Sequence, residues 1–252
     1  MSKNNPSNST FIDHFTDLRN MLIFCFLTVI ICSIFSYFFA EDIISFLVSP
    51  LNDVMTSVKS TNRLIYTNLA EGFLTYLRIS VFSGFVISLP VILYKVWFFI
   101  SPALKIKEKK IISYFALSSF ICFILGFVFC YFYIMPLAWK FLLGFQSLAS
   151  ETSVAIDLEA RLGNYISLSI AMILAFGFMF QMPVVLFLLL DANVINVNNL
   201  VSFRRYYIVS VFTISALVTP PDVVSQVGLS IPLILFYEVI IYLYRKLKDF
   251  DC

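Results

Sequence analysis

Two aspartates near the N-terminus could bind a basic ligand. Asp13 and Asp17 lie four residues apart within residues 10–21, where apolar side chains recur at helical spacing. Residues four apart share one face of a helix, so this spacing presents both carboxylates together. The alternative is an ordinary solvated face. Residues 1–19 are expected to contain an amphipathic helix on a membrane surface that leads into the first apolar run.

A second candidate carboxylate lies in the first basic segment of the chain. Glu108 is surrounded by lysines and follows an elbow formed by the aromatic residues 97–99 and Pro102. One interpretation is that the lysines only fix the membrane topology, as the positive-inside rule describes, and that Glu108 has no specific role. The other is a functional carboxylate, because neither the acid nor the aromatic elbow is needed for topology.

Polar residues inside or beside apolar runs are further candidates. Gln181 lies within the run 162–190 and can hydrogen-bond another helix. Asp222 and Gln226 flank a turn near the end of the chain. Glu238 follows with Arg245 as a candidate neighbour; it is either a functional intramembrane acid or an interfacial one.

The sequence contains no recognisable enzyme motif. HExxH, Walker A, GxSxG and GxGxxG patterns are all missing. His14 is the single histidine, and a solvated or capping role is the simplest interpretation of it. The five cysteines lie in apolar runs or at the last residue, which disfavours a disulfide framework or metal cluster. We therefore expect no enzymatic activity, no cofactor and no metal. Because the sequence lacks an ATP-binding motif, any energy-requiring process that the protein supports must use a gradient or a partner.

The composition identifies the environment in which these residues act. Of 252 residues, 60% are hydrophobic and 13% are charged, whereas soluble domains carry about 25% charge. A single soluble core could not bury this apolar surface, which includes 29 phenylalanines. Soluble globular, disordered and disulfide-scaffold classes are excluded, and an all-α integral membrane protein is indicated.

Six membrane spans are predicted within a single membrane domain. Their approximate bounds are 20–40, 73–94, 111–139, 162–190, 206–221 and 223–244. The charge-free parts of the last two runs fall short of a bilayer core of about 30 Å and predict a short helical hairpin. Most of the 17 lysines and arginines lie before the first span, between the second and third, between the fourth and fifth, or after the sixth. This distribution predicts that both termini are cytoplasmic.

Several motifs match one known family in order along nearly the whole chain. They are residues 14–19 (HFTDLR), 49–51 (SPL), 89–104 (LPVILYKVWFFISPAL), Glu108, 176–183, and 219–226 (TPPDVVSQ) with Pro232 and Glu238. In these stretches the chain resembles the TatC family of the twin-arginine translocase. The resemblance implies six helices around a concave surface, with short fifth and sixth helices, in the bacterial inner membrane.

The resemblance also implies a function and its residues. Such proteins bind twin-arginine signal peptides at the cytoplasmic face and export folded proteins with single-span TatA-type and TatB-type subunits, using the proton-motive force. A homo-oligomer within the complex is expected, with the lipid bilayer as surroundings and no nucleic acid as partner. The implied signal-peptide residues are Asp17, Arg19, Phe99, Pro102 and Glu108. The implied partner-binding residues are Thr219 and Gln226, and further polar or structural positions are Pro50, Gln181, Asp222 and Glu238.

Three residues depart from the family pattern. Asp17 stands where the family usually has glutamate, Gln181 stands where many members have glutamate, and Ala216 replaces a larger residue near the partner site. A small-solute secondary transporter is the alternative function, but it predicts inverted repeats and a polar midplane site. An intramembrane enzyme would need a catalytic constellation at depth. The sequence favours the translocase over both.

Overall fold

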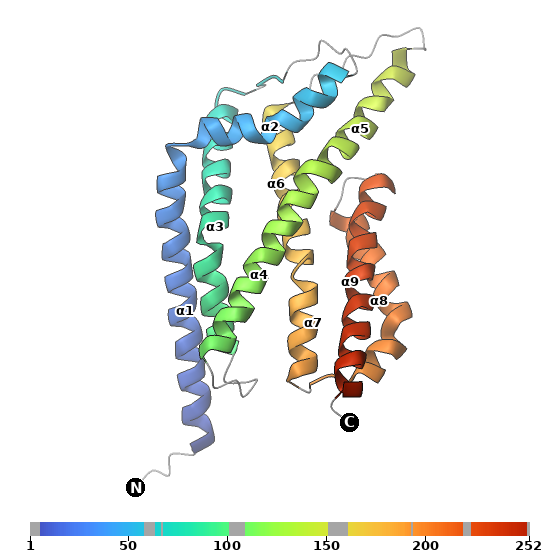
Figure 1. Cartoon of the computed structure of the whole chain (residues 1–252). Coiled ribbons are helices and arrows are strands. Elements are labelled where there is room, and N and C mark those ends of the chain that lie inside the picture. The colour runs from blue at the N-terminus through green and yellow to red at the C-terminus, as the bar shows by residue number, and fades with distance from the viewer. Residues whose placement is uncertain are drawn as a thin grey trace. The chain divides into compact units, whose positions relative to one another are not determined.

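The computed structural model describes residues 6–57, 64–66, 68–100, 109–150, 161–192, 194–218 and 223–250 (Figure 1). In these residues the secondary structure is helical apart from one isolated bridge between Ile65 and Arg161. The chain divides into two compact units: Met1–Glu41 with Tyr76–Phe120, and Asp42–Thr75 with Ile121–Cys252. Each unit is described by itself.

Close helix packing shapes the first unit, which holds α1 (Pro6–Tyr37), most of α3 (Glu71–Ile100) and the start of α4 (Lys109–Phe129). At Gly84 of α3, an added Cβ would collide with the backbone of Ser33 in α1. The adjacent Ser36 and Ser83 hydroxyls hydrogen-bond each other. Small residues that let backbones approach are typical of membrane helix interfaces. Gly84 therefore lets α1 and α3 come close enough for the Ser36 and Ser83 hydroxyls to hydrogen-bond.

The second unit begins with α2 (Ala40–Ser57), which is tied to neighbouring helices by tyrosines. Pro50 is buried inside α2 and has no N–H to donate to the carbonyl of Phe46, four residues earlier. The Tyr131 hydroxyl donates to that carbonyl oxygen at 2.7 Å, and the Tyr165 hydroxyl donates to Leu47 O at 2.6 Å. The hydrogen bond that the proline cannot make inside α2 is thus supplied by another segment.

The third predicted span continues beyond its expected end. α4 passes into a π-helical turn, η1 (Cys130–Ile134), and then into α5 (Met135–Ser150). Pro136 lies at the second position of α5, one residue beyond the start of the helix that follows η1. A π-turn widens the helix locally, so the proline is accommodated without ending the helix.

The fourth span is broken close to its polar residue. α6 (Leu162–Met179) ends and α7 (Met182–Asp191) begins around Gln181, with Pro183 in the first turn of α7. The start of α6 is stabilised by Glu71, whose Oε1 accepts from the backbone N–H of Gly163 at 3.1 Å. A carboxylate satisfies the free N–H groups of a helix N-terminus and favours its dipole. Close packing recurs in α6, because a Cβ on Gly177 would collide with the Phe123 ring of α4.

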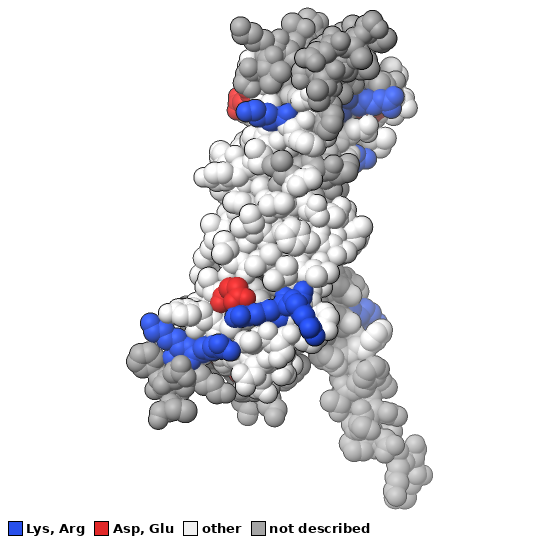
Figure 2. Space-filling model, turned by 90° about the vertical axis from the view of Figure 1, so that its right-hand side faces the viewer, with Lys and Arg blue, Asp and Glu red and all other residues white. Residues whose placement is uncertain are grey.

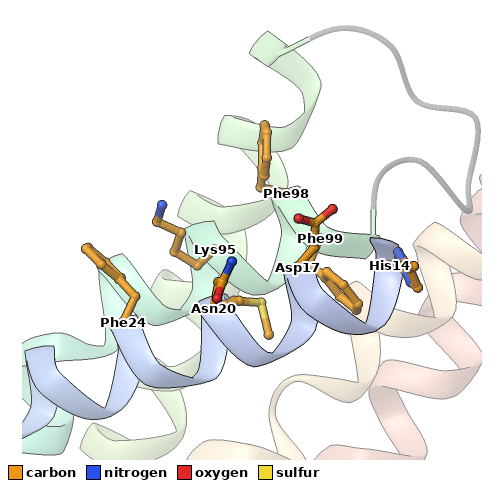
Figure 3. Close-up of a pocket in the computed structure, with 8 residues that line it drawn as sticks. His14, Asp17, Asn20, Phe24, Lys95, Phe98 and Phe99 are labelled. Carbon is orange, nitrogen blue, oxygen red and sulfur yellow. The ribbon is translucent and has the colours of Figure 1, made fainter. Parts of the chain in front are cut away.

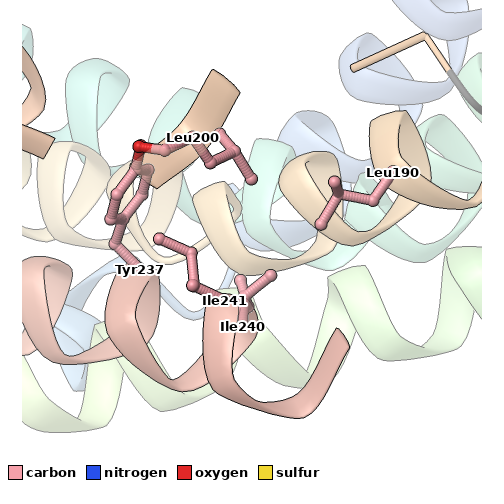
Figure 4. Close-up of a cluster of buried hydrophobic side chains, with 5 residues drawn as sticks. All are labelled: Leu190, Leu200, Tyr237, Ile240 and Ile241. Atoms are coloured by element: carbon pink, nitrogen blue, oxygen red, sulfur yellow. The ribbon is translucent and has the colours of Figure 1, made fainter. Parts of the chain in front are cut away.

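α8 (Val197–Val218) and α9 (Val223–Phe250) lie side by side (Figure 1). A buried apolar cluster joins them to α7 (Figure 4), and its members are Leu190, Leu200, Tyr237, Ile240 and Ile241. The Tyr237 hydroxyl donates to Leu200 O at 2.8 Å, and the Tyr244 hydroxyl donates to Leu190 O at 2.9 Å. Tyr237 is buried and Tyr244 is half-buried, and the hydroxyl of each donates a hydrogen bond to a backbone carbonyl of a neighbouring helix.

Within the part of the chain that the structure describes, six helical segments are long and apolar enough to cross a membrane. They are His14–Tyr37, Glu71–Ile100, Ile112–Gly144, Leu162–Asp191, Val197–Leu217 and Ser225–Lys246. The predicted all-α fold with six membrane helices is confirmed, and the last two candidate spans, at 21 and 22 residues, are the shortest. The face drawn in Figure 2 agrees with this assignment, since its charged side chains gather in two groups separated by uncharged surface.

Helix boundaries differ from the expected ones in two places. The fifth helix begins at Val197 rather than near residue 206, because Arg204 and Arg205 are accommodated within it and Arg204 is paired with an acid of α9. The N-terminal segment is continuous with the first span in α1, and Phe15 of its expected apolar stripe is 63% exposed. Charge alone is a poor marker of where a helix starts, since a paired arginine does not interrupt it.

Candidate functional site

A pocket of about 380 Å³ lies between α1 and α3 in the first unit (Figure 3). We refer to it as the α1–α3 pocket. Its lining residues are His14, Asp17, Asn20, Met21, Phe24, Lys95, Phe98 and Phe99. It combines aromatic walls with one carboxylate, one amide and one ammonium group.

Helical spacing explains why these residues meet. His14, Asp17, Met21 and Phe24 follow one another at intervals of three or four residues, which places them on one face of α1. Lys95 precedes Phe98 and Phe99 by three and four residues on α3, so these side chains share a face as well. The pocket forms where these two faces meet.

Aromatic contacts define the two ends of the pocket. At one end the His14 ring stacks on Phe99, with centroids 4.4 Å apart and planes 13° from parallel. At the other end the Lys95 Nζ lies 4.5 Å from the centroid of the Phe24 ring. The first contact is an offset or parallel aromatic pair, and the second is a cation–π interaction. Both contacts hold wall residues of α1 against α3.

Asp17 is exposed and directed into the pocket. Figure 3 shows its carboxylate on the same side of α1 as the Asn20 amide and the Lys95 ammonium group. An exposed carboxylate beside aromatic surfaces suits a guanidinium ligand, which can form a fork of hydrogen bonds and stack its plane on a ring. Arg19 is exposed and does not line the pocket; its Nη2 donates to Asn20 Oδ1 at 3.5 Å.

A second polar region joins α8 to α9, and we call it the α8–α9 joint. Its members are Arg204, Tyr207, Ser215, Gln226, Ser230, Tyr237 and Glu238. Arg204 Nη2 and Glu238 Oε2 form an ion pair at 2.7 Å, so the partner of Glu238 is Arg204 rather than Arg245. Nearby, the rings of Tyr207 and Tyr237 stack with centroids 4.0 Å apart.

Gln226 makes its hydrogen bond within the joint. Its Nε2 donates to Phe212 O of α8 at 3.2 Å, and Ser230 Oγ donates to Ser215 Oγ at 3.0 Å. These contacts fasten the two helices to each other. Among the implied partner residues, the structure thus gives Gln226 a partner inside the chain.

The comparisons with known proteins identify the family. A family model described as "Sec-independent protein translocase protein (TatC)" matches residues 13–232, which is most of the chain. The chain belongs to the TatC family.

Relatives and solved structures cover nearly the whole of this TatC-family chain. Sec-independent protein translocase protein TatC of Rickettsia prowazekii (strain Madrid E) is 38% identical over 229 residues, covering 91% of this chain and 90% of that protein. The protein of the same name from Aquifex aeolicus (strain VF5) is 39% identical over 233 residues, covering 92% of each chain. A crystal structure of the twin arginine translocase receptor TatC in DDM shares 38% identity over 91% of this chain and 98% of that chain, with a TM-score of 0.78.

Family membership gives the broad role of the chain. It is a component of a Sec-independent protein translocase, hence of a transport system, and with six apolar helices it is a multi-pass membrane protein. The resemblance inferred from the sequence motifs is confirmed.

The structure brings together only some of the implied site residues. Asp17 and Phe99 meet in the α1–α3 pocket, whereas Pro50 lies in α2 and Gln181 lies at the break between α6 and α7. Four residues implied by the TatC resemblance lie outside the described residues: Pro102, Glu108, Thr219 and Asp222.

Sequence reasoning assigned only Asp17 and Phe99 of the eight lining residues to the site, and its omissions include His14, Lys95 and Phe24. His14 was expected to be solvated or capping, but it stacks on Phe99. Lys95 was counted only as a basic residue of the inner segment, and Phe24 only as part of a span. The spacing of His14, Asp17 and Phe24 indicates that they share one face of a helix. It does not indicate which residues of α3 pack against that face. Among the described residues, no group of three His, Cys, Asp or Glu side chains could hold a metal ion.

Proposed function

We propose that this protein is the receptor subunit of a twin-arginine translocase, and that the α1–α3 pocket forms part of its signal-peptide site. The observation that carries the proposal is the Asp17 carboxylate directed into a pocket whose wall includes Phe99. Both residues belong to motifs shared with the TatC family. Their meeting in one pocket supports the role that the resemblance implies for each.

The chemistry of the pocket favours arginine over lysine. A guanidinium presents several N–H donors in a plane and bonds a carboxylate through two of them, whereas an ammonium group makes point contacts. The guanidinium plane can also lie against an aromatic ring. Asp17 would supply the carboxylate and Phe99, held by His14, would supply the ring. Glu108, with Pro102 shaping the elbow before it, would provide the second carboxylate for an arginine pair.

The other parts of the proposal concern topology and assembly. The distribution of basic residues supports cytoplasmic termini, and the TatC resemblance implies a bacterial inner membrane. With this topology the α1–α3 pocket would lie on the side from which substrates arrive. Without an ATP motif, transport of folded proteins would draw on the proton-motive force. The protein would act in a complex containing further copies of itself.

The α8–α9 joint is the proposed docking region for single-span partners of the TatA and TatB types. Its support is that hydroxyl and amide groups line the contact between α8 and α9, because polar groups in a membrane interface can hydrogen-bond a partner helix. Thr219 and Gln226 are the residues that the proposal assigns to this contact, and Asp222 is a further polar position that the TatC resemblance implies.

A peptide-binding measurement tests the receptor role. The full-length protein in nanodiscs would be titrated with a fluorescent signal peptide bearing an arginine pair and with its lysine-pair version. We expect the arginine peptide to bind about tenfold more tightly, because weakening a charge-paired contact at a partly solvated site costs about 1–2 kcal/mol. Asp17→Ala and Glu108→Ala should each reduce this preference.

The control is Asp42→Ala, which removes an exposed carboxylate from α2, outside the α1–α3 pocket. It should leave both affinities unchanged. Equal binding of the two peptides, unaffected by Asp17→Ala or Glu108→Ala, would refute the receptor role assigned to these residues.

A further inference from the structure

A group of basic side chains lies at the end of the α8–α9 pair where α8 begins and α9 ends. Its members are Arg204 and Arg205 of α8 and Arg245 and Lys246 of α9, and we call them the basic surface. Arg204 is half-buried and the other three are exposed. In the lower part of Figure 2, basic side chains gather around one acidic side chain.

Helical spacing and one ion pair bring these groups together. Arg245 follows Glu238 by seven residues, which is two turns or about 10 Å along α9. Tyr242 lies between them on the same face of the helix and is 65% exposed. Because Glu238 contacts Arg204 at 2.7 Å, this face of α9 lies beside the cations of α8.

One acid cannot neutralise the basic surface. Arg204 and Glu238 cancel each other's charge. Within the part of the chain that the structure describes, none of Arg205, Arg245 and Lys246 forms an ion pair. An excess of positive charge therefore remains, and it attracts an anionic ligand.

Arg205 is held in position on the surface of α8. Its Nη2 donates to the Tyr206 hydroxyl at 3.1 Å, and its Cζ lies 4.8 Å from the Tyr206 ring centroid. A cation that serves only topology can lie in a loop and needs no such contact. Arg205 instead lies eight residues after Val197, the first residue of α8, and most of its N–H donors remain available to a ligand.

The surroundings of the basic surface favour a lipid as the ligand. Both helices are candidate membrane spans, and they carry large side chains near the cations that are between 50% and 65% exposed: Phe203, Tyr206, Val239, Tyr242 and Leu243. In a bilayer these side chains contact lipid, and tyrosines are common where acyl chains meet headgroups. An arginine binds phosphate through a planar fork of N–H donors. A phospholipid supplies both the phosphate and the apolar chains.

We propose that the basic surface binds the headgroup of an anionic phospholipid, with Arg205 and Arg245 contacting its phosphate. Glu238 engages Arg204 and limits the affinity, because a carboxylate beside a phosphate repels it. Basic groups between membrane helices are a general means of binding anionic headgroups. This inference is independent of the signal-peptide role proposed for the α1–α3 pocket.

Lipid selectivity at the basic surface tests the proposal. Tyr242→Trp in the full-length protein places a fluorescent reporter between Glu238 and Arg245, and the protein with Tyr242 retained gives the background of its two tryptophans. The fluorescence would be titrated in zwitterionic detergent micelles with brominated phosphatidylglycerol or brominated phosphatidylcholine, which quench on contact. We expect phosphatidylglycerol to bind about 25-fold more tightly, with about fivefold from each of the two arginines.

Charge variants of the reporter protein identify the residues. Arg205→Gln and Arg245→Gln should each lower the selectivity about fivefold. Glu238→Gln should raise it by a similar factor, since it releases Arg204 for the phosphate, and adding Arg204→Gln should return it to the starting value. The matched control is Lys140→Gln, which removes one exposed base from α5 and should change nothing.

The outcomes separate a lipid from other anions. Equal quenching by the two lipids, or equal losses with Lys140→Gln and Arg245→Gln, would overturn the proposal. Replacing chloride by inorganic phosphate at constant ionic strength should leave the selectivity in place, and its loss would show that the surface takes a free phosphate instead. The protein is alone in the micelle, so an acidic segment of another protein cannot produce the signal. The lipid comparison needs no charge substitution, so it remains decisive if a Glu238 variant fails to fold.

Discussion

The α1–α3 pocket and the α8–α9 joint use similar residue types in opposite ways. Each contains an acid, a base and stacked aromatic rings. In the joint, Arg204 and Glu238 satisfy each other at 2.7 Å, and Tyr207 stacks directly on Tyr237. In the pocket, Asp17 and Lys95 line an open volume of about 380 Å³. An acid and a base that contact each other fasten two helices together, whereas an acid and a base that line an open volume remain available to a ligand.

This contrast predicts that stability and binding depend on different residues. Substitutions in the joint should change the free energy of unfolding and leave peptide affinity of the folded protein unchanged. Substitutions in the pocket should do the reverse, because Asp17 is exposed and Lys95 is only half-buried, so these charges contribute little to folding.

The largest expected effect is in the joint. Tyr237→Ala removes a ring that is 3% exposed, its stack on Tyr207 and its hydrogen bond to Leu200 O. We expect a loss of about 3–5 kcal/mol in the free energy of unfolding, as for other buried aromatic truncations. Unfolding in mixed detergent micelles would measure it. Tyr242→Ala on the same helix is the control, because that side chain is 65% exposed, and comparable losses for both tyrosines would contradict the assignment.

A smaller effect is expected from the ion pair of the joint. The side chains of Arg204 and Glu238 are 40% and 42% exposed, so solvent weakens their attraction. A double-mutant cycle of Arg204→Ala and Glu238→Ala should give a coupling of about 1 kcal/mol in the free energy of unfolding. A parallel cycle with Arg205→Ala, whose guanidinium lies over Tyr206, should give no coupling to Glu238. Equal coupling in both cycles would show that the joint depends on net charge and not on this pair.

The smallest expected effect is on peptide binding, from substitution of His14 in the pocket. His14→Ala removes the ring that stacks on Phe99 and should weaken peptide binding by about threefold, within the range of 0.5–1.5 kcal/mol typical of aromatic pairs. His14→Phe should keep wild-type affinity, since it keeps the stack. Phe15→Ala is the control, because Phe15 is the adjacent exposed ring outside the pocket lining. Weaker binding by His14→Phe equal to that of His14→Ala would show that the imidazole itself is required.

The sequence predicted the helices better than their contacts. Apolar runs and the rarity of charge identify six membrane helices, and the motif around Asp17 and Phe99 indicates two residues of the pocket. The start of α8 was missed because a charge inside a helix looks like a boundary until its partner, here Glu238, is known. The roles of His14 and Lys95 were missed for a related reason, since each depends on a residue of another helix.

The proline of α2 makes one backbone carbonyl of that helix depend on a side chain from another segment. Pro50 leaves the carbonyl of Phe46 without its usual donor, and the hydroxyl of Tyr131, 85 residues from Phe46 in sequence, supplies the replacement. A residue that normally weakens a helix thus leaves a carbonyl of α2 free to accept a hydrogen bond from η1. Loss of the Tyr131 hydroxyl would leave that carbonyl without this donor, so one polar group of α2 depends on a side chain of a distant part of the chain.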